Sequence, residues 1–257
     1  MREYDFEAGE VLVFDKPLHW TSFNLVKQVR NTLSRRMGIK RLRVGHAGTL
    51  DPLASGVMII CTGRATKDIS SLQTGTKEYI ATMQLGCTTP SFDAEHSVDD
   101  TCPVMHITRQ LIEETLPRFV GSIMQIPPAY SACKVAGRRA FDYARSGEAV
   151  ELKAKELVIE EIELLSFISP QEALLADRKP ELTVRVVCSK GTYIRALARD
   201  IGQALGSGAF LTALRRTRIG DYSLEDCHVD VADIERWAKE VPIVTKQTTS
   251  EKDKIEK

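Results

Sequence analysis

Residues 45–56 read Gly-His-Ala-Gly-Thr-Leu-Asp-Pro-Leu-Ala-Ser-Gly, a glycine-rich loop that carries one carboxylate and leads into the apolar segment 57–61. Its three glycines allow tight turns and a close approach of the backbone to a ligand. Pro52 biases Asp51 toward an extended conformation, so that the carboxylate stands out from the loop. An Asp before Pro is most often a turn residue. The neighbouring sequence nevertheless favours Asp51 as a candidate catalytic residue.

Basic side chains gather at two places along the chain. Residues 35–43 hold five cations in nine positions just before the Asp51 loop, an arrangement that suits a phosphate-rich ligand. Residues 134–145 interleave cations with aromatic rings, a pattern that suits contact with an RNA backbone and base stacking. The alternatives are a solvated basic face for the first cluster and an amphipathic helix with a basic outer face for the second.

Composition limits the class of protein. The 257 residues are 43% hydrophobic and 27% charged, which is typical of a soluble globular protein of one large or two modest domains. With 35 basic and 35 acidic residues, any nucleic-acid site must arise from local clustering of cations. The six cysteines form no CxxC pair and the five histidines no HExxH motif, so we expect no metal. Without an N-terminal signal or a long apolar run, the sequence predicts a cytoplasmic protein that does not contact membranes.

Hydrophobic periodicity predicts a mixed α/β chain. The expected strands are 11–15, the apolar segment that follows the Asp51 loop, 78–85 and 182–188. One helix is expected to begin at a cap on Thr21 or Ser22, and two more are expected over 109–116 and 194–205. Arg195 falls in the first turn of the last helix, where a cation opposes the helix dipole. Its placement there calls for a buried carboxylate partner, unless it is an ordinary surface arginine.

Several separated motifs occur in a fixed order. They are residues 45–56, Lys77-Glu78-Tyr79, Phe92-Asp93-Ala94, residues 125–134 with Gly137 and Ala144-Arg145-Ser146-Gly147, Lys190-Gly191-Thr192-Tyr193-Ile194-Arg195, and Ala213-Leu214-Arg215-Arg216. Through them the chain resembles the TruB-type tRNA pseudouridine synthases, in a bacterial short form, over roughly residues 9–222.

The resemblance implies a pseudouridine synthase fold of mixed α+β class: a long, mostly antiparallel sheet with flanking helices. It implies a catalytic domain over residues 9–240, with a helical insertion near 105–150 that clasps RNA. We expect the polar segment 241–257 to be a disordered tail. Only 35 residues follow Tyr222, too few for the C-terminal PUA-type RNA-binding module of many relatives.

By the same resemblance the protein isomerises the uridine at position 55, in the T-loop of tRNA. The N1–C1′ glycosidic bond breaks, the uracil rotates, and C5 bonds to C1′; the reaction needs no cofactor. The partner is the T-arm of tRNA, and we expect a monomer without an obligate protein partner. Two alternatives remain: a non-catalytic tRNA-binding or RNA-folding protein, and a hydrolytic glycosidase that uses Asp93 as its second carboxylate.

The resemblance also assigns three catalytic residues. Asp51 matches the essential aspartate, which either attacks C1′ or helps to form a glycal by taking the 2′ proton. Arg195 matches the arginine that pairs with that aspartate and fixes its orientation. Tyr79 matches the tyrosine that packs on the flipped uracil, and the resemblance also implies that it helps to remove the C5 proton. Because the usual pKa of a tyrosine makes it a poor base, stacking is its main expected role.

The remaining assignments concern substrate binding. Leu214 resembles the apolar residue that closes the uracil pocket, and Asp93, His46 and Lys67 are expected to contact the substrate or the pocket edge. Flipping the base out of the T-loop costs a few kcal/mol, which phosphate contacts and stacking must offset. We expect four cations of the second cluster to make such contacts: Lys134, Arg138, Arg139 and Arg145.

Overall fold

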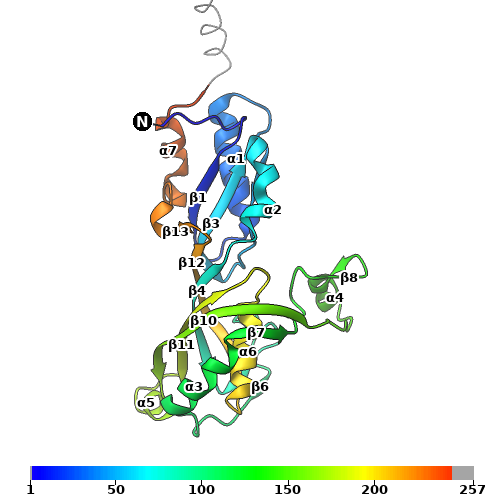
Figure 1. The fold of residues 1–257 in the computed structure, drawn as a ribbon, viewed down its shortest axis with the longest axis vertical. Coiled ribbons are helices and arrows are strands. Elements are labelled where there is room, and N and C mark those ends of the chain that lie inside the picture. The colour runs from blue at the N-terminus through cyan, green and yellow to red at the C-terminus, as the bar shows by residue number, and fades with distance from the viewer. Residues whose placement is uncertain (1, 245–257) are drawn as a thin grey trace, which may run out of the picture. The chain divides into compact units, whose positions relative to one another are not determined.

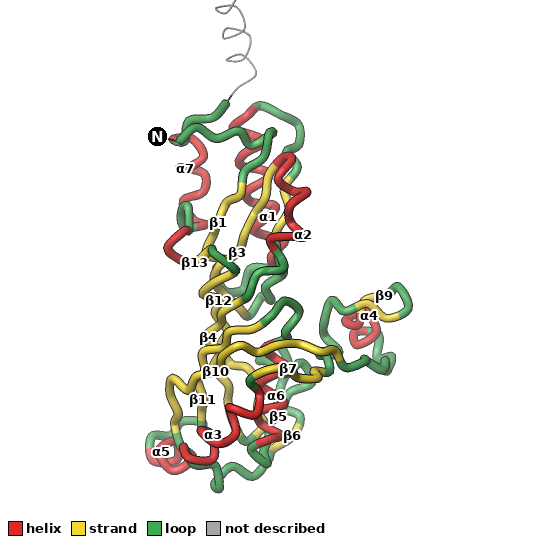
Figure 2. Tube along the Cα trace, viewed as in Figure 1, coloured by secondary structure: helices red, strands yellow, loops and turns green. Residues whose placement is uncertain are grey.

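The computed structural model describes residues 2–244, and the chain divides into two compact units. The first unit comprises the residues up to 75 together with those from 217 onward, and the second comprises residues 76–216. Each unit pairs antiparallel strands and flanks them with helices (Figure 1, Figure 2). This confirms the mixed α+β class. None of the described helices is long and apolar enough to cross a membrane.

The first unit is built on β1 and β3, which pair antiparallel, with β2 on the other side of β3. Its elements are β1 (Val11–Lys16), α1 (Ser22–Met37), β2 (Val44–His46), β3 (Ala54–Thr62), α2 (Ile69–Leu72), β13 (Tyr222–Ser223) and α7 (Ile234–Glu240). Side chains alternate along the strands, so that Phe14 and Met58 pack with α1 and α7 while Val13 and Ile59 pack on the face that α2 covers.

Helix α1 forms as its sequence predicts. Thr21 is the N-cap, and its hydroxyl accepts a hydrogen bond from the Asn24 amide at 3.0 Å. Val26, Val29 and Leu33 are buried on one face, as their spacing indicates. The helix ends at Gly38, whose φ of 65° places it in the left-handed region where glycine is favoured.

The second unit is built on the strand order β4-β11-β10-β7, with every pair antiparallel. Its elements are β4 (Lys77–Leu85), β5 (Cys87–Thr88), β6 (Asp100–Thr101), α3 (Arg109–Thr115), β7 (Gly121–Gln125), β8 (Lys134–Val135), β9 (Arg138–Arg139), α4 (Ala140–Arg145), β10 (Lys155–Ile168), α5 (Pro170–Leu175), β11 (Glu181–Cys188) and α6 (Ile194–Ala204). Strand β12 (Ala209–Ile219) continues from this unit into the first.

The segment 105–150 is less helical than the resemblance to the family implies. Its residues 121–125 form β7, which pairs with β10, and only α3 and α4 are α-helical. Between β8 and β9, Ala136 and Gly137 adopt φ values of 49° and 84°, which close a two-residue hairpin. This hairpin, α4 and the following turn stand out from the strands of the second unit as a lobe (Figure 2). We call residues 134–148 the basic lobe.

The expectation of disorder is wrong for the first residues of the expected tail, 241–244. The Tyr4 amide donates to the Pro242 carbonyl at 2.9 Å, and the Val244 amide donates to the Tyr4 carbonyl at 3.0 Å. These backbone hydrogen bonds hold residues 241–244 against the N-terminal segment. The rest of the expected tail, residues 245–257, lies outside the described residues.

Candidate functional site

The Asp51 loop connects β2 to β3 in the first unit, and its glycines are needed for its shape. Gly48 and Gly56 have φ values of 98° and 115°, which other residues rarely adopt. A Cβ atom on Gly45 would lie 2.6 Å from Cδ1 of Ile69, so a larger residue there would push against α2. Asp51 itself is partly exposed, and so is His46 at the start of the loop.

The first turn of α1 fixes the residue before Asp51. The buried Ser22 hydroxyl accepts a hydrogen bond from the Leu50 amide at 2.8 Å and donates to the Leu50 carbonyl at 2.9 Å. Both backbone polar groups of Leu50 are therefore satisfied by one side chain. Since the Asp51 backbone follows directly, Ser22 sets where the candidate carboxylate leaves the loop.

Replacing Ser22 with alanine is expected to lower the free energy of unfolding by about 1–3 kcal/mol, because two buried backbone groups lose their partner. Hydrogen exchange at the Leu50 amide should become faster, as mass spectrometry of the native protein can measure. Ser70→Ala on the exposed side of α2 is the control, with little effect on either quantity expected. Unchanged exchange at Leu50 in the Ser22 variant would contradict this role for the hydroxyl.

Tyr79 lies near the start of β4, as predicted, and is 8% exposed. Lys77 is two residues earlier on the same face of the strand and is also buried. Burial, and next the Arg216 cation, lower the pKa of Lys77 below its ordinary value. Arg216 is 1% exposed on β12. Both residues lie inside the quoted motifs, but recognising them as buried cations requires knowing which way each strand faces.

Arg195 is buried in the first turn of α6, where its guanidinium holds a loop of the second unit in place. Its Nη1 donates to the Ser91 carbonyl at 3.1 Å and its Nη2 to the Tyr130 carbonyl at 3.0 Å. Its Nε lies 3.6 Å from Oδ2 of Asp93, a buried carboxylate that also accepts from the Ser91 hydroxyl at 2.6 Å. Asp93 thus supplies the carboxylate that a cation at this helix position requires.

The other expected substrate contacts are distributed over both units. Lys67 is exposed on the turn after β3, and Leu214 is partly buried on β12. The four cations of the second cluster all lie on the basic lobe. Three of them, Lys134, Arg139 and Arg145, are exposed there, whereas Arg138 forms an ion pair with Glu148 at 2.9 Å.

Part of the first basic cluster lines an open groove of about 450 Å³ in the first unit, which we call the α1 groove. It is lined by Arg30, Asn31, Ser34, Arg35, Ile39, Lys40 and Arg41. Among the described residues its lining holds four cations and no carboxylate. The Arg30 side chain is oriented by a hydrogen bond, because its Nη2 donates to the Val44 carbonyl at 3.2 Å. Arg35 forms an exposed ion pair with Glu235 at 3.5 Å, so the positive charge of the groove rests mainly on Arg30, Lys40 and Arg41.

Comparison with protein families places the chain in a class. Residues 35–194 match the model of the TruB family pseudouridylate synthase N-terminal domain, and residues 195–245 match the tRNA pseudouridylate synthase B C-terminal domain. The protein is therefore a pseudouridylate synthase. It belongs to the TruB family, which confirms the resemblance read from its motifs.

Curated relatives cover nearly the whole chain. The tRNA pseudouridine synthase B of Bacteroides thetaiotaomicron is 62% identical over 233 residues, which are 91% of this chain and 94% of that protein. The tRNA pseudouridine synthase B of Flavobacterium johnsoniae is 46% identical over 227 residues, covering 88% and 95% of the two chains.

Solved structures carry the same fold. The archaeal box H/ACA sRNP Nop10–Cbf5 complex matches with a TM-score of 0.61 and 26% identity over 91% of this chain. The Cbf5–Nop10–Gar1 complex matches with a TM-score of 0.59 and 28% identity over 85% of it. This chain spans only 54% and 50% of those two chains, about half of their length.

Proposed function

We propose that this protein isomerises the T-loop uridine at position 55 of tRNA to pseudouridine. The observation that carries the proposal is membership of the TruB family, together with the high identity to proteins named tRNA pseudouridine synthase B. The N1–C1′ bond breaks, the uracil turns, a C5–C1′ bond forms, and the proton from C5 leaves as N1 gains one. The atoms balance without an oxidant or a hydrolytic water.

The roles of the side chains follow from the motifs that match the family. Asp51 acts in its ionised form, either as the nucleophile at C1′ or as the base that helps to form a glycal. Arg195 pairs with this carboxylate during the reaction, and Tyr79 stacks on the flipped uracil. Leu214 closes the pocket and keeps water from the sugar intermediate. His46 and Lys67 contact the extruded nucleotide.

Asp93 acts mainly through Arg195. Its carboxylate lies 3.6 Å from the arginine and accepts a hydrogen bond from the Glu95 amide at 3.0 Å, which fixes its orientation. A residue held in this way can orient the guanidinium that serves the catalytic aspartate. The arrangement favours the synthase over the glycosidase, because Asp93 is committed to a cation rather than available as a general acid.

Two basic surfaces are proposed to bind the RNA backbone: the α1 groove in the first unit and the basic lobe in the second. The T-arm is the part of the tRNA that these surfaces hold while the target base is flipped. We propose that the protein acts as a monomer in the cytoplasm, without an obligate protein partner.

Tritium release separates the candidate functions. A tRNA transcript labelled with tritium at C5 of uridine is incubated with the protein in the presence of EDTA, and tritium in water is measured together with free uracil. The synthase releases tritium from the T-loop uridine and leaves the uracil bound to the RNA. Free uracil would identify a glycosidase, and tight tRNA binding without release would identify a non-catalytic RNA-binding protein.

Substituting Arg41 in the α1 groove by glutamine is expected to weaken tRNA binding about fivefold, because one phosphate contact is lost. The slope of the logarithm of the association constant against the logarithm of the salt concentration should become shallower by about 0.7–0.9. Fluorescence titrations at several salt concentrations can measure this slope. Arg64→Gln, which removes an exposed cation outside the groove, is the matched control. Equal slopes for the Arg41 variant and the wild type would exclude the groove from the RNA interface.

A further inference from the structure

The basic lobe has almost no apolar core. Among residues 134–148 only Ala140 is buried, α4 spans six residues, and each strand of the hairpin spans two. Elements of this length are unstable on their own in water. The shape of the lobe must therefore depend on polar contacts between its side chains and backbone.

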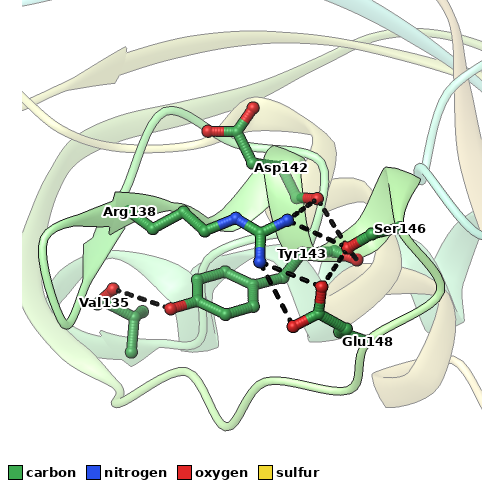
Figure 3. A network of polar contacts seen from close by, with 6 residues as sticks. All are labelled: Val135, Arg138, Asp142, Tyr143, Ser146 and Glu148. Carbon is green, nitrogen blue, oxygen red and sulfur yellow. Dashed lines mark hydrogen bonds and ion pairs between the residues drawn. The ribbon is translucent and has the colours of Figure 1, made fainter.

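Arg138 is the centre of those contacts (Figure 3). Its Nη1 donates to both carboxylate oxygens of Glu148, at 2.9 and 3.2 Å. Its Nη2 donates to the Asp142 carbonyl at 2.8 Å and to the Ser146 hydroxyl at 3.0 Å. The guanidinium also lies over the Tyr143 ring, 4.3 Å from its centroid. One side chain thus joins β9, α4 and the turn after the helix.

The partners of Arg138 reinforce this network. The Ser146 hydroxyl donates to Oε1 of Glu148 at 2.6 Å, and the Tyr143 hydroxyl donates to the Val135 carbonyl at 3.4 Å (Figure 3). Hydrogen bonds from Ser146, and next from Arg138, lower the pKa of Glu148, so that its carboxylate stays ionised. The hydrogen bond to Glu148 in turn raises the pKa of Arg138.

The other three cations of the lobe are placed differently. Lys134, Arg139 and Arg145 are exposed and form no ion pair with the described residues. Arg139 and Arg145 both lie over Phe141, with their guanidinium carbons 5.7 and 5.3 Å from the ring centroid. Their charge is available to a phosphate, whereas the terminal nitrogens of Arg138 are occupied.

We propose that Arg138 is a positioning residue that locks the basic lobe, so that Lys134, Arg139 and Arg145 are presented to the tRNA backbone in a preformed arrangement. This rests on the proposed function and corrects one part of it, because Arg138 was expected to bind phosphate itself. For Arg138 to bind a phosphate through its terminal nitrogens, its pair with Glu148 would have to open, which would leave a carboxylate facing the RNA. Preorganisation of the three exposed cations lowers the entropic cost of binding.

The effect of removing Glu148 decides between the two roles, because they predict opposite signs. If Arg138 locks the lobe, Glu148→Ala loosens it and weakens tRNA binding about five- to tenfold, with a raised KM and a kcat within about twofold of wild type. If Arg138 binds phosphate, the same change frees a cation and removes a repelling carboxylate, so binding tightens. Glu151→Ala is the control, because this substitution removes the same charge at an exposed position outside the Arg138 network.

The salt dependence of binding gives a second, independent readout. Arg138→Met should weaken tRNA binding without changing the slope of log K against log salt, whereas Arg139→Met should make the slope shallower by about 0.7–0.9. A shallower slope for the Arg138 variant, or unchanged or tighter binding by the Glu148 variant, would overturn the proposal.

Limited proteolysis without RNA separates this proposal from the proposed function. Trypsin should cleave the lobe at Lys134, Arg139 or Arg145 at least about fivefold faster in Glu148→Ala than in the wild type, with Glu151→Ala unchanged. Equal cleavage rates for Glu148→Ala and the wild type would contradict the positioning role of Arg138. If the wild-type protein forms no pseudouridine in tRNA but Glu148→Ala is still cleaved faster, the proposed function is overturned. The positioning role of Arg138 within the lobe would then stand.

Discussion

Asp51→Asn is expected to reduce pseudouridine formation in tRNA by at least about a thousandfold, a loss typical of removing a nucleophile or a general base. The amide has nearly the same shape as the carboxylate but can neither attack C1′ nor take a proton. Since the loop is held by its glycines and by Ser22, the fold should persist and tRNA should bind within about twofold of wild type. Single-turnover kinetics with tritium-labelled tRNA measures the rate.

Asp68→Asn provides the matched control for this experiment. It removes one carboxylate from an exposed position of the same unit and should leave the rate unchanged. Thermal unfolding of both variants shows whether the fold is intact. A rate for Asp51→Asn within about tenfold of wild type would exclude the carboxylate from the chemical step under either route.

Arg195→Met is expected to lower the free energy of unfolding by about 3–5 kcal/mol, because it leaves Asp93 as a buried carboxylate without its cation. The carbonyls of Ser91 and Tyr130 lose their donors in the same substitution. Urea denaturation measures the change. Arg109→Met, whose pair with Glu113 is exposed at 3.6 Å, should cost less than about 0.5 kcal/mol.

The double variant Arg195→Met with Asp93→Asn separates the structural from the catalytic role of the arginine. Neutralising Asp93 removes the unpaired buried charge, so more than about 1 kcal/mol of stability should return. Pseudouridine formation should not return, since the proposed partner of Asp51 is still missing. A stability of Arg195→Met within about 1 kcal/mol of wild type would contradict the buried ion pair.

Local signals predicted the regular parts of the fold. The cap at Thr21 and the spacing of Val26, Val29 and Leu33 identified α1, and alternation identified β4 and β11. The strand β10 was missed because its side chains are mostly exposed, so the apolar alternation is weak. β12 was missed because burial does not alternate along it, and because one of its buried side chains is Arg216, a residue type that is rarely buried.

The contacts within the candidate site could not be predicted from local sequence patterns. Motifs made Asp51, Tyr79 and Arg195 candidates, because each of these side chains lies in a short segment that matches the family. The buried pair of Asp93 with Arg195 joins residues about a hundred positions apart, and no local pattern encodes such a contact. Nor could the sequence separate Arg138 from its neighbouring cations, since its partner Glu148 is defined only by the fold of the lobe.

Mapping pseudouridine at nucleotide resolution in an unmodified tRNA transcript tests whether the protein modifies position 55 and whether Asp51 is required. After incubation with the wild-type protein, we expect pseudouridine at one position, the T-loop uridine at position 55, and none there with Asp51→Asn. Modification at other uridines while position 55 stays unmodified, or no modification of a tRNA that the protein binds, would contradict this expectation.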